Sequence, residues 1–334
     1  WKLPFQPDGL MQSAYQIACA RTADDLENSP DLWDSDWVES DQSLFVDYQG
    51  ESLQSRDQVF WKVRFKGADG AVSDWSQPAS FEMGLLDLGD WQAEWIFRPE
   101  EKPEESTPPA YLRKTFSLSN KEIERARVYV ASRGIFHLEV NGERVGDDHF
   151  QSEWTDYGKR SLVATYDIKH LLQAGDNAVG VNLGECWYAG KLGYRDEQNK
   201  YGDIPQIILQ LEISYADGSR EIVPSDQSWK AATGPILMSS LYNGERYDAR
   251  LELGEWSSPA YDASSWQNVG TEKHDPSILL EPRPNQPVRA IKELKPVSMT
   301  EISPGKYIFD FGQNMVGWVR IRAKGEAGKS YTCL

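Results

Sequence analysis

The chain has 334 residues, of which 26% are charged and 40% hydrophobic, a composition typical of globular domains. Its length predicts about two to three domains, and no apolar run reaches the roughly 18 residues that cross a bilayer, so we expect no membrane insertion. The 52 Asp and Glu residues outnumber the 35 Lys and Arg residues, which gives a formal charge of −17. Such a field repels phosphate backbones and excludes nucleic acid as an expected partner.

The sequence predicts strands along nearly its whole length. Segments that alternate apolar or aromatic residues with polar ones are separated by turns such as Asn141-Gly142, which supply the positive φ of a tight hairpin. Long segments with the period of an amphipathic helix are missing. The predicted strands are 15–20, 58–65, 127–131, 136–140, 178–183, 207–215, 306–311 and 317–321. Short strands at regular spacing predict an all-β protein made of tandem β-sandwich domains.

Changes in composition divide the chain into three parts. Residues 99–109 are rich in Pro, Glu, Ser and Thr and predict an exposed loop, while residues 281–287 hold three prolines and predict a linker. We therefore expect a first β-sandwich over 1–88, a second and larger one over 89–285, and the beginning of a further β-domain over 286–334.

The first domain contains Ser73-Asp74-Trp75-Ser76, which resembles the Trp-Ser element of fibronectin type III domains. In such domains an indole ring is sandwiched between cationic side chains, and Arg64 and Lys62 are the cations that we expect around Trp75. We interpret this domain as fibronectin type III-like, with a structural role as spacer or docking surface.

The middle region carries a series of motifs in a fixed order. They are 140–147 (VNGERVGD), 154–157 (WTDY), 175–180 (GDNAVG), 183–190 (LGECWYAG), 225–230 (SDQSWK), 244–250 (GERYDAR) and, near the end, 310–314 (DFGQN). Together they resemble the N-terminal jelly-roll sandwich of bacterial α-L-rhamnosidases of glycoside hydrolase family 78, and the resemblance covers nearly the entire chain. One departure is Cys186, since relatives usually have glycine there.

The resemblance implies hydrolysis of terminal α-L-rhamnose with inversion, by one carboxylic acid that protonates the leaving oxygen and one carboxylate that activates water. In such enzymes a downstream (α/α) barrel carries both groups, and this chain has no segment of helical period long enough to begin one. We therefore assign no catalytic residue and expect the chain to be inactive alone. The expected partners are a rhamnose-containing oligosaccharide or glycoside and the enzyme's own C-terminal barrel.

The middle domain also resembles a carbohydrate-binding jelly roll that holds calcium and rhamnose in some relatives. The aromatic side chains expected to frame a sugar ring are Trp154, Trp187, Tyr188 and Tyr194. The oxygen ligands expected for calcium, the one cofactor that the sequence suggests, are Asp147, Asp148 and Asn199. The alternative is that the aromatic residues complete the sandwich core and that the acids are turn formers.

Other polar residues favour structural roles. The charged segment 244–250 predicts an internal salt-bridge network, and the four histidines show no metal-binding or triad spacing. Cys19, Cys186 and Cys333 are too far apart in sequence for a disulfide framework or a thiolate zinc site.

Two rival functions stay open at this stage. One is a carbohydrate-binding or adhesion protein without a hydrolase, and the other is a related glycosidase that cleaves a different sugar. A reading frame that continues into a long helical region would favour the enzyme. The sequence contains no compartment signal. We expect a bacterial protein that is periplasmic or secreted rather than cytoplasmic.

Overall fold

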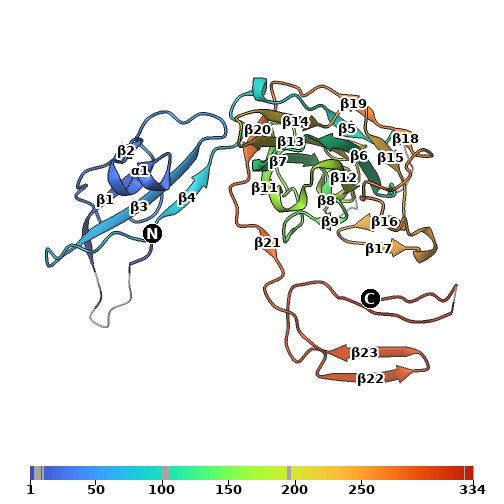
Figure 1. The fold of residues 1–334 in the computed structure, drawn as a ribbon. Coiled ribbons are helices and arrows are strands. Elements are labelled where there is room, and N and C mark those ends of the chain that lie inside the picture. The colour runs from blue at the N-terminus through green and yellow to red at the C-terminus, as the bar shows by residue number, and fades with distance from the viewer. Residues whose placement is uncertain (4–8, 10, 100–105, 194–196, 327, 334) are drawn as a thin grey trace. The chain divides into compact units, whose positions relative to one another are not determined.

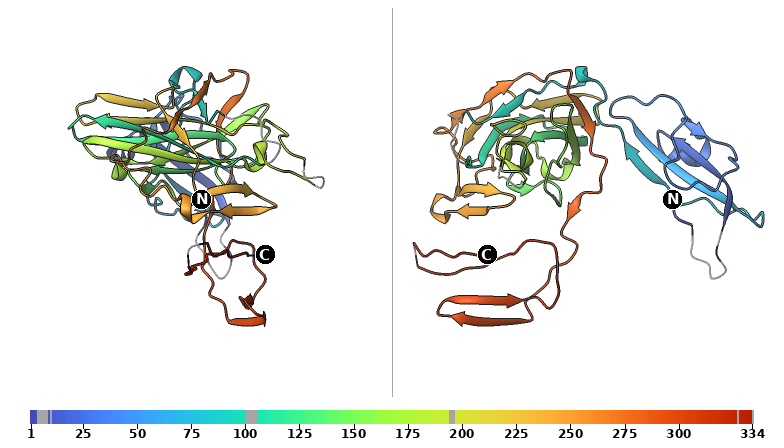
Figure 2. Two further views of the ribbon diagram at one scale, coloured as in Figure 1. Left: turned by 90° about the vertical axis from the view of Figure 1, so that its right-hand side faces the viewer. Right: turned by 180° about the vertical axis from the view of Figure 1, so that it is seen from behind.

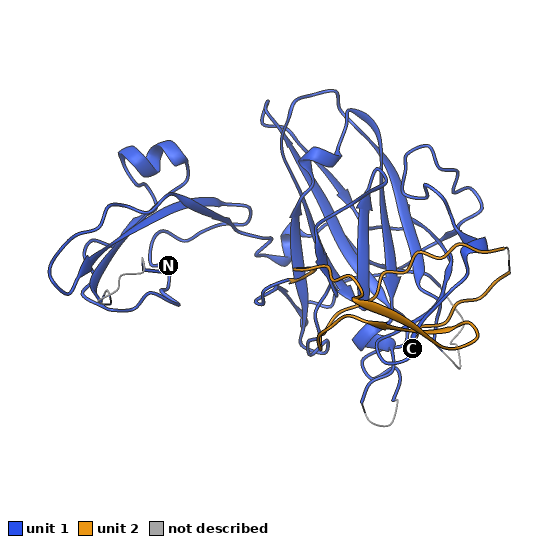
Figure 3. Cartoon of the chain, turned by 90° about the horizontal axis from the view of Figure 1, so that it is seen from below, with its two compact units in different colours: residues 1–287 blue, residues 288–334 orange. Residues whose placement is uncertain are grey.

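The computed structural model describes residues 1–3, 9, 11–99, 106–193, 197–326 and 328–333, and strands dominate it, as the sequence predicts (Figure 1). Two compact units divide the chain between Pro287 and Val288 (Figure 3). The domain boundaries at 88/89 and 285/286 stay predictions. Within the described ranges, no helix is long and apolar enough to span a membrane.

The N-terminal region forms one antiparallel sheet in the order β2-β1-β3-β4. Its elements are β1 (Gln12–Ala20), α1 (Ala23–Asn28), β2 (Trp33–Asp34), β3 (Gln58–Gly67) and β4 (Ala79–Glu82). Tyr15 pairs with Phe65 and Ile17 with Val63, so the buried side chains of β1 and β3 share one core. Thr22 begins α1, because its hydroxyl accepts the backbone N–H of Asp25.

The predicted cation–π element is confirmed. The guanidinium carbon of Arg64 lies 4.6 Å from the ring centroid of Trp75, and Lys62 Nζ lies 5.3 Å from it. Arg64 also lies 5.0 Å from the ring centroid of Trp37. The cationic side chains of β3 therefore hold two indole rings on one face of the sheet.

The middle region is a sandwich of a seven-stranded and a six-stranded sheet (Figure 2). Before the first long strand pair come η1 (Leu88–Asp90) and β5 (Trp95–Phe97). The other elements are β6 (Ala110–Leu118), β7 (Ile123–Arg133), β8 (Ile135–Val140), β9 (Glu143–Arg144), β10 (Asp148–His149), β11 (Arg160–Asp167), η2 (Lys169–Leu171), β12 (Gly175–Gly184), α2 (Cys186–Ala189), β13 (Gln206–Tyr215), β14 (Arg220–Pro224), β15 (Lys230–Ala232), β16 (Ile236–Ser240), β17 (Gly244–Tyr247), η3 (Ala249–Leu251), β18 (Gln267–Asn268), β19 (Gly270–Glu272) and β20 (Leu279–Pro282).

The core of this sandwich comes from the inward residues of both sheets. The larger sheet runs β19-β5-β13-β7-β11-β20, with β14 also paired to β13, and the smaller one runs β18-β15-β6-β12-β8-β9. Leu112, Leu138 and Val181 of the smaller sheet pack in one buried cluster with Leu209 and Val130 of the larger sheet. The Asn141-Gly142 turn joins β8 to β9 with φ values of 54° and 85°, as predicted for a tight hairpin.

The second unit contains β21 (Val288–Arg289) and the antiparallel hairpin of β22 (Ser298–Ser303) and β23 (Lys306–Asp310). Every residue of β22 and β23 is exposed. The predicted strand 317–321 is wrong: these residues have no strand structure. Their apolar pattern fits a strand, but a strand also needs a hydrogen-bonding partner, and the described part of the chain provides none there.

Arg56 ties the N-terminal sheet to the middle sandwich. Its Nε and Nη2 atoms donate to the two carboxylate oxygens of Glu212 on β13 at 2.6 and 2.7 Å, and its Nη1 atom donates to Asp90 at 2.7 Å. Glu212 is 5% exposed. This fork is therefore a largely desolvated, two-point ion pair rather than a surface contact.

A second ion pair between the two parts has the reverse arrangement, with the carboxylate on the N-terminal sheet and the arginines on the middle sandwich. Glu82 of β4 accepts from Arg127 Nη2 at 2.6 Å, from Arg127 Nε at 2.8 Å and from Arg125 Nη2 at 2.9 Å. These hydrogen bonds, with that of Arg127 the strongest, lower the pKa of Glu82 from its ordinary value. A lowered carboxylate pKa stabilises the fold above that ordinary value, and the contribution is lost as the pH falls below it.

We expect Arg56→Ala to lower the free energy of unfolding by about 3 kcal/mol, because it removes the closest cation from the buried Glu212 and leaves only Arg220, whose Nη1 atom lies 3.9 Å from it. Urea denaturation measures this loss. The control is Arg21→Ala, which breaks an ion pair with Asp31 in which the two side chains are 47% and 37% exposed. That exposed pair is expected to contribute less than about 1 kcal/mol. Equal losses in the two variants would contradict the assignment.

Candidate functional site

A cluster of aromatic rings lies where β12 ends. The chain leaves β12 through Glu185 into α2, which carries Trp187 and Tyr188. The Tyr157 ring packs edge-on against Tyr188 and against Tyr201, with centroids 5.2 Å apart in both pairs. Tyr188 is 9% exposed, so it lies beneath the cluster and supports it.

Other members of the cluster are accessible. Trp154 is 54% exposed, and its indole Nε1 donates to the Tyr201 hydroxyl at 3.1 Å. Trp187 is half-buried and lies 6.3 Å, centroid to centroid, from Phe150, which is 37% exposed. We call these four residues, Phe150, Trp154, Trp187 and Tyr201, the aromatic platform. Its exposed ring faces and fixed hydroxyl are the features that stack on and hydrogen-bond to a sugar ring.

Sequence reasoning found only part of this cluster. The structure brings the predicted Trp154, Trp187 and Tyr188 together, whereas Tyr194 lies outside the described residues. It also adds Phe150, Tyr157 and Tyr201, which the prediction missed. Tyr157 is the last residue of the four-residue motif that begins at Trp154, so the sequence motif could have indicated it. No motif in the sequence contains Tyr201.

The first residue after β12 is a buried carboxylate. Glu185 is 2% exposed and accepts from the Thr107 backbone N–H at 2.5 Å and from the Ser106 hydroxyl at 2.6 Å. Burial raises its pKa above the ordinary value of 4.5. These two hydrogen bonds fasten the chain that leads into β6 to the end of β12.

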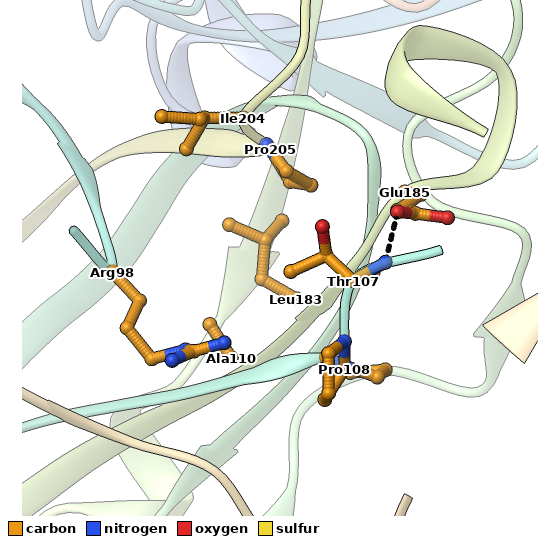
Figure 4. Close-up of a pocket in the computed structure, with 10 residues that line it drawn as sticks. Arg98, Thr107, Pro108, Ala110, Leu183, Glu185, Ile204 and Pro205 are labelled. Atoms are coloured by element: carbon orange, nitrogen blue, oxygen red, sulfur yellow. Dashed lines mark hydrogen bonds between the residues drawn. The ribbon is translucent and has the colours of Figure 1, made fainter. Parts of the chain in front are cut away.

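A small pocket adjoins Glu185. Figure 4 shows Arg98 and Glu185 on opposite sides of Leu183, with Thr107 and Pro205 completing the wall. Its enclosed space holds about one water molecule. A sugar ring does not fit there, and the aromatic platform is therefore the better candidate for sugar contact.

Cys186 occupies the position where the sequence resemblance predicts glycine. Its φ is 42°, in the left-handed region that favours glycine, and its thiol is buried. Glycine adopts this conformation without steric cost, so the chain meets this backbone requirement with a strained residue.

Asp148, one of the predicted calcium ligands, is held in a protein network. It is 5% exposed, it pairs with Arg283 Nη1 at 3.0 Å, and it accepts from the Tyr166 hydroxyl at 3.0 and 3.1 Å and from the Gln151 side-chain amide. Both carboxylate oxygens are therefore used. In this arrangement the guanidinium group of Arg283 balances the charge of Asp148.

The other two predicted ligands are exposed. Asp147 follows a tight turn, and Asn199 has a φ of 61° and donates its backbone N–H to Ala189 at 3.1 Å. Among the residues that the structure describes, no group of three or more His, Cys, Asp and Glu side chains converges on one point. Calcium binding by the predicted residues stays a prediction.

The charged segment 244–250 forms a local contact. Arg250 Nη2 pairs with Asp248 at 2.6 Å, and the Asp248 side chain also accepts the Arg250 backbone N–H at the start of η3. Among the described residues, this segment forms one ion pair, between Asp248 and Arg250, so the predicted internal network is smaller than expected.

Comparison with known proteins follows the same division of the chain. Residues 1–87 match the Rha78A-like N-terminal immunoglobulin domain, residues 121–292 match the alpha-L-rhamnosidase N-terminal domain, and residues 300–333 match the bacterial alpha-L-rhamnosidase concanavalin-like domain. The second match covers more than half of the chain. The chain belongs to the alpha-L-rhamnosidase N-terminal domain family.

Relatives are much longer than this chain. An alpha-L-rhamnosidase of Alteromonas sp. (strain LOR) is 40% identical over 96% of the chain, which spans 36% of that relative's length. The structure of the alpha-L-rhamnosidase from Dictyoglumus thermophilum is 36% identical, with a TM-score of 0.82, and covers 94% of this chain and 36% of its own.

A Streptomyces avermitilis alpha-L-rhamnosidase, solved in complex with L-rhamnose, is 26% identical with a TM-score of 0.83 over 92% of this chain and 46% of its own. An alpha-L-rhamnosidase sequence from Streptomyces avermitilis is 28% identical and aligns with this chain over 494 residues, more than the 334 present here. The aligned region of that sequence therefore contains additional segments. The bound L-rhamnose is an observation on the solved Streptomyces avermitilis structure.

We expect Asp148→Asn to lower the free energy of unfolding by about 3 kcal/mol, because it removes the closest counter-charge of the largely buried Arg283 guanidinium and leaves only Glu153, 3.7 Å away. Urea denaturation in calcium and in EDTA measures this loss. If the network has the structural role described, the loss is the same in both buffers and the wild-type protein is equally stable in both. A wild-type protein that loses stability on chelation would show that calcium, and not Arg283, is the main partner.

Glu185 gives a prediction about pH. Because its folded-state pKa is raised, it makes the protein less stable as the pH rises from about 4.5 through the folded pKa. Glu185→Gln keeps an acceptor for Thr107 and removes this dependence, so we expect the variant to gain stability relative to wild type between pH 4.5 and 7. Glu185→Ala leaves the buried Thr107 N–H unsatisfied and should cost about 1 to 3 kcal/mol at either pH. A Gln variant that instead loses stability relative to wild type as the pH rises would contradict the assignment.

Proposed function

We propose that this chain is the N-terminal accessory part of an α-L-rhamnosidase that hydrolyses terminal non-reducing α-L-rhamnose from rhamnosides with inversion. One comparison supports the proposal. The Alteromonas alpha-L-rhamnosidase is 40% identical to this chain over 96% of the chain's length, and the aligned region is only 36% of that enzyme. The catalytic acid and base then belong to the remaining part of the enzyme, in its barrel domain.

Within this chain, the proposed role is positioning and sugar contact. Glu185 is a buried carboxylate in a pocket, but its neighbouring space holds about one water molecule, which rules it out as the acid at a glycosidic bond. The reciprocal arginine forks hold the N-terminal sheet on the middle sandwich. The aromatic platform supplies exposed ring faces for a rhamnoside, by stacking of its apolar face.

The expected partners follow from this role. They are a rhamnose-containing oligosaccharide or glycoside and the enzyme's own barrel domain, and a periplasmic or secreted location suits access to such glycans. We assign no step to calcium.

A chimeric enzyme tests the proposed function. This chain replaces the aligned 36% of the Alteromonas relative, and release of p-nitrophenol from p-nitrophenyl α-L-rhamnoside is measured. We expect the chimera to retain activity within about tenfold of the parent, a difference of about 1.4 kcal/mol in barrier height, and this chain alone to show none. Thermal melting of the chimera serves as the folding control. A folded chimera without activity would contradict the proposal and favour an adhesion or binding protein.

A further inference from the structure

Two rings of the aromatic platform, Phe150 and Trp154, lie on a segment of irregular backbone. The structure describes all of residues 150–154, and they belong to no helix or strand. One isolated bridge, between Gln151 and Phe136, joins their backbone to the sandwich. Because no ladder of backbone hydrogen bonds continues through the segment, side-chain contacts determine how its two rings are held.

A largely buried carboxylate lies next to each of these rings in the sequence. Asp148 comes two residues before Phe150, and Glu153 immediately precedes Trp154. The side chains of the two acids are 4% and 17% exposed. A carboxylate in such a position needs close cationic or hydrogen-bonding partners. The groups that hold the two acids therefore also fix the backbone beside each ring.

One arginine contacts both carboxylates. The Arg283 Nη1 atom lies 3.0 Å from Asp148 Oδ2, its Nε atom lies 3.7 Å from Glu153 Oε1, and its side chain is 15% exposed. Its backbone N–H donates to the Val163 carbonyl at 3.1 Å, directly after the parallel pairing of β20 with β11. Arg283 is therefore anchored in the sandwich, and its planar guanidinium group spans the two acids.

Asn285 adds a second contact at Glu153. Its Nδ2 atom donates to Glu153 Oε2 at 2.5 Å, while the Tyr157 hydroxyl donates to the Glu153 backbone carbonyl at 3.5 Å. The next residue, Trp154, donates its indole N–H to the Tyr201 hydroxyl at 3.1 Å. The segment that leaves β20 thus holds the residue before Trp154, and Tyr201 holds the far end of its ring.

Anchoring of this kind matters for sugar contact, because stacking needs ring faces that are already in place. A sugar that binds to loosely held side chains must order them, and the loss of conformational entropy weakens its binding. Trp154 is 54% exposed and Phe150 is 37% exposed, so neighbouring atoms cover only part of each ring. The anchors at Asp148 and Glu153 therefore supply order that the packing of the rings does not.

We propose that Arg283 and Asn285 are positioning residues for the aromatic platform. By holding the two carboxylates, they order the platform rings before a sugar arrives, and they do not touch the sugar themselves. The inference rests on the proposed contact between the platform and a rhamnoside. It gives a functional role to part of the segment 281–287, which the sequence alone predicts as a linker.

Calorimetric titration of the whole chain with a neutral disaccharide that ends in α-L-rhamnose tests the proposal. Asn285→Ala removes the amide donor, Asn285→Gln keeps one, and Arg283→Lys keeps the charge but not the planar fork. Glu281→Gln is the matched control, because Glu281 lies on the same segment but pairs with Arg160, and these two side chains are 39% and 45% exposed. Hydrogen exchange of residues 150–157, read by mass spectrometry, measures the order of the platform segment. Melting temperatures confirm that each variant is folded.

We expect Asn285→Ala and Arg283→Lys to weaken sugar binding about three- to tenfold, because the ordering that the anchors provide must then occur on binding. The same variants should speed hydrogen exchange within residues 150–157. Asn285→Gln should retain most of the affinity, and Glu281→Gln should match the wild type in both measurements. A merely structural role would change the melting temperature and leave the affinity of the folded protein unaltered.

Three results overturn the positioning role alone. They are wild-type affinity in both Asn285→Ala and Arg283→Lys, an equal loss of affinity in the Glu281→Gln control, and weaker binding without faster exchange, which would place the two residues in contact with the sugar. A wild-type chain that binds no disaccharide overturns the sugar contact of the platform and this inference with it. The chimera assay still decides the enzymatic function in that case.

Discussion

The alternation of side chains along β12 determines where the other features of the middle sandwich lie. Val179, Val181 and Leu183 are buried in the core, whereas Gly180 and Asn182 lie on the opposite face. Because the strand has a period of two, a slip of one residue would bury Asn182 and expose the valines, so the register is strongly fixed. Gly180 leaves the space that the Trp256 ring occupies. The end of the same strand then places Glu185 and the aromatic rings of α2.

Two buried carboxylates, Glu212 and Asp148, are paired with arginines, and these pairs explain how parts of the molecule are held. Glu212 is 5% exposed and receives two hydrogen bonds from Arg56, and Asp148 is 5% exposed and pairs with Arg283. Taking a carboxylate out of water costs several kcal/mol, which only a close, hydrogen-bonded cation offsets. Each pair therefore gives little net stability but makes wrong arrangements costly, since any other placement would leave a buried charge alone.

Local features could be predicted from the sequence, and contacts between distant residues could not. Strand periodicity, the Asn141-Gly142 turn and the cations around Trp75 depend on neighbours in the chain or on one strand, and the structure confirms them. The local sequence of Asp148 shows only a polar loop. Its actual partner, Arg283, lies 135 residues further along, and no local pattern indicates that pairing.

The candidate sites show the same limit. Trp154, Trp187 and Tyr188 were recognisable because aromatic residues near turns are few, but Tyr201, which fixes the Trp154 indole, comes from a different loop. Segment 317–321 has the composition of a strand, and its prediction failed because a strand depends on a partner as much as on its own residues. In both cases the missing information was a tertiary contact.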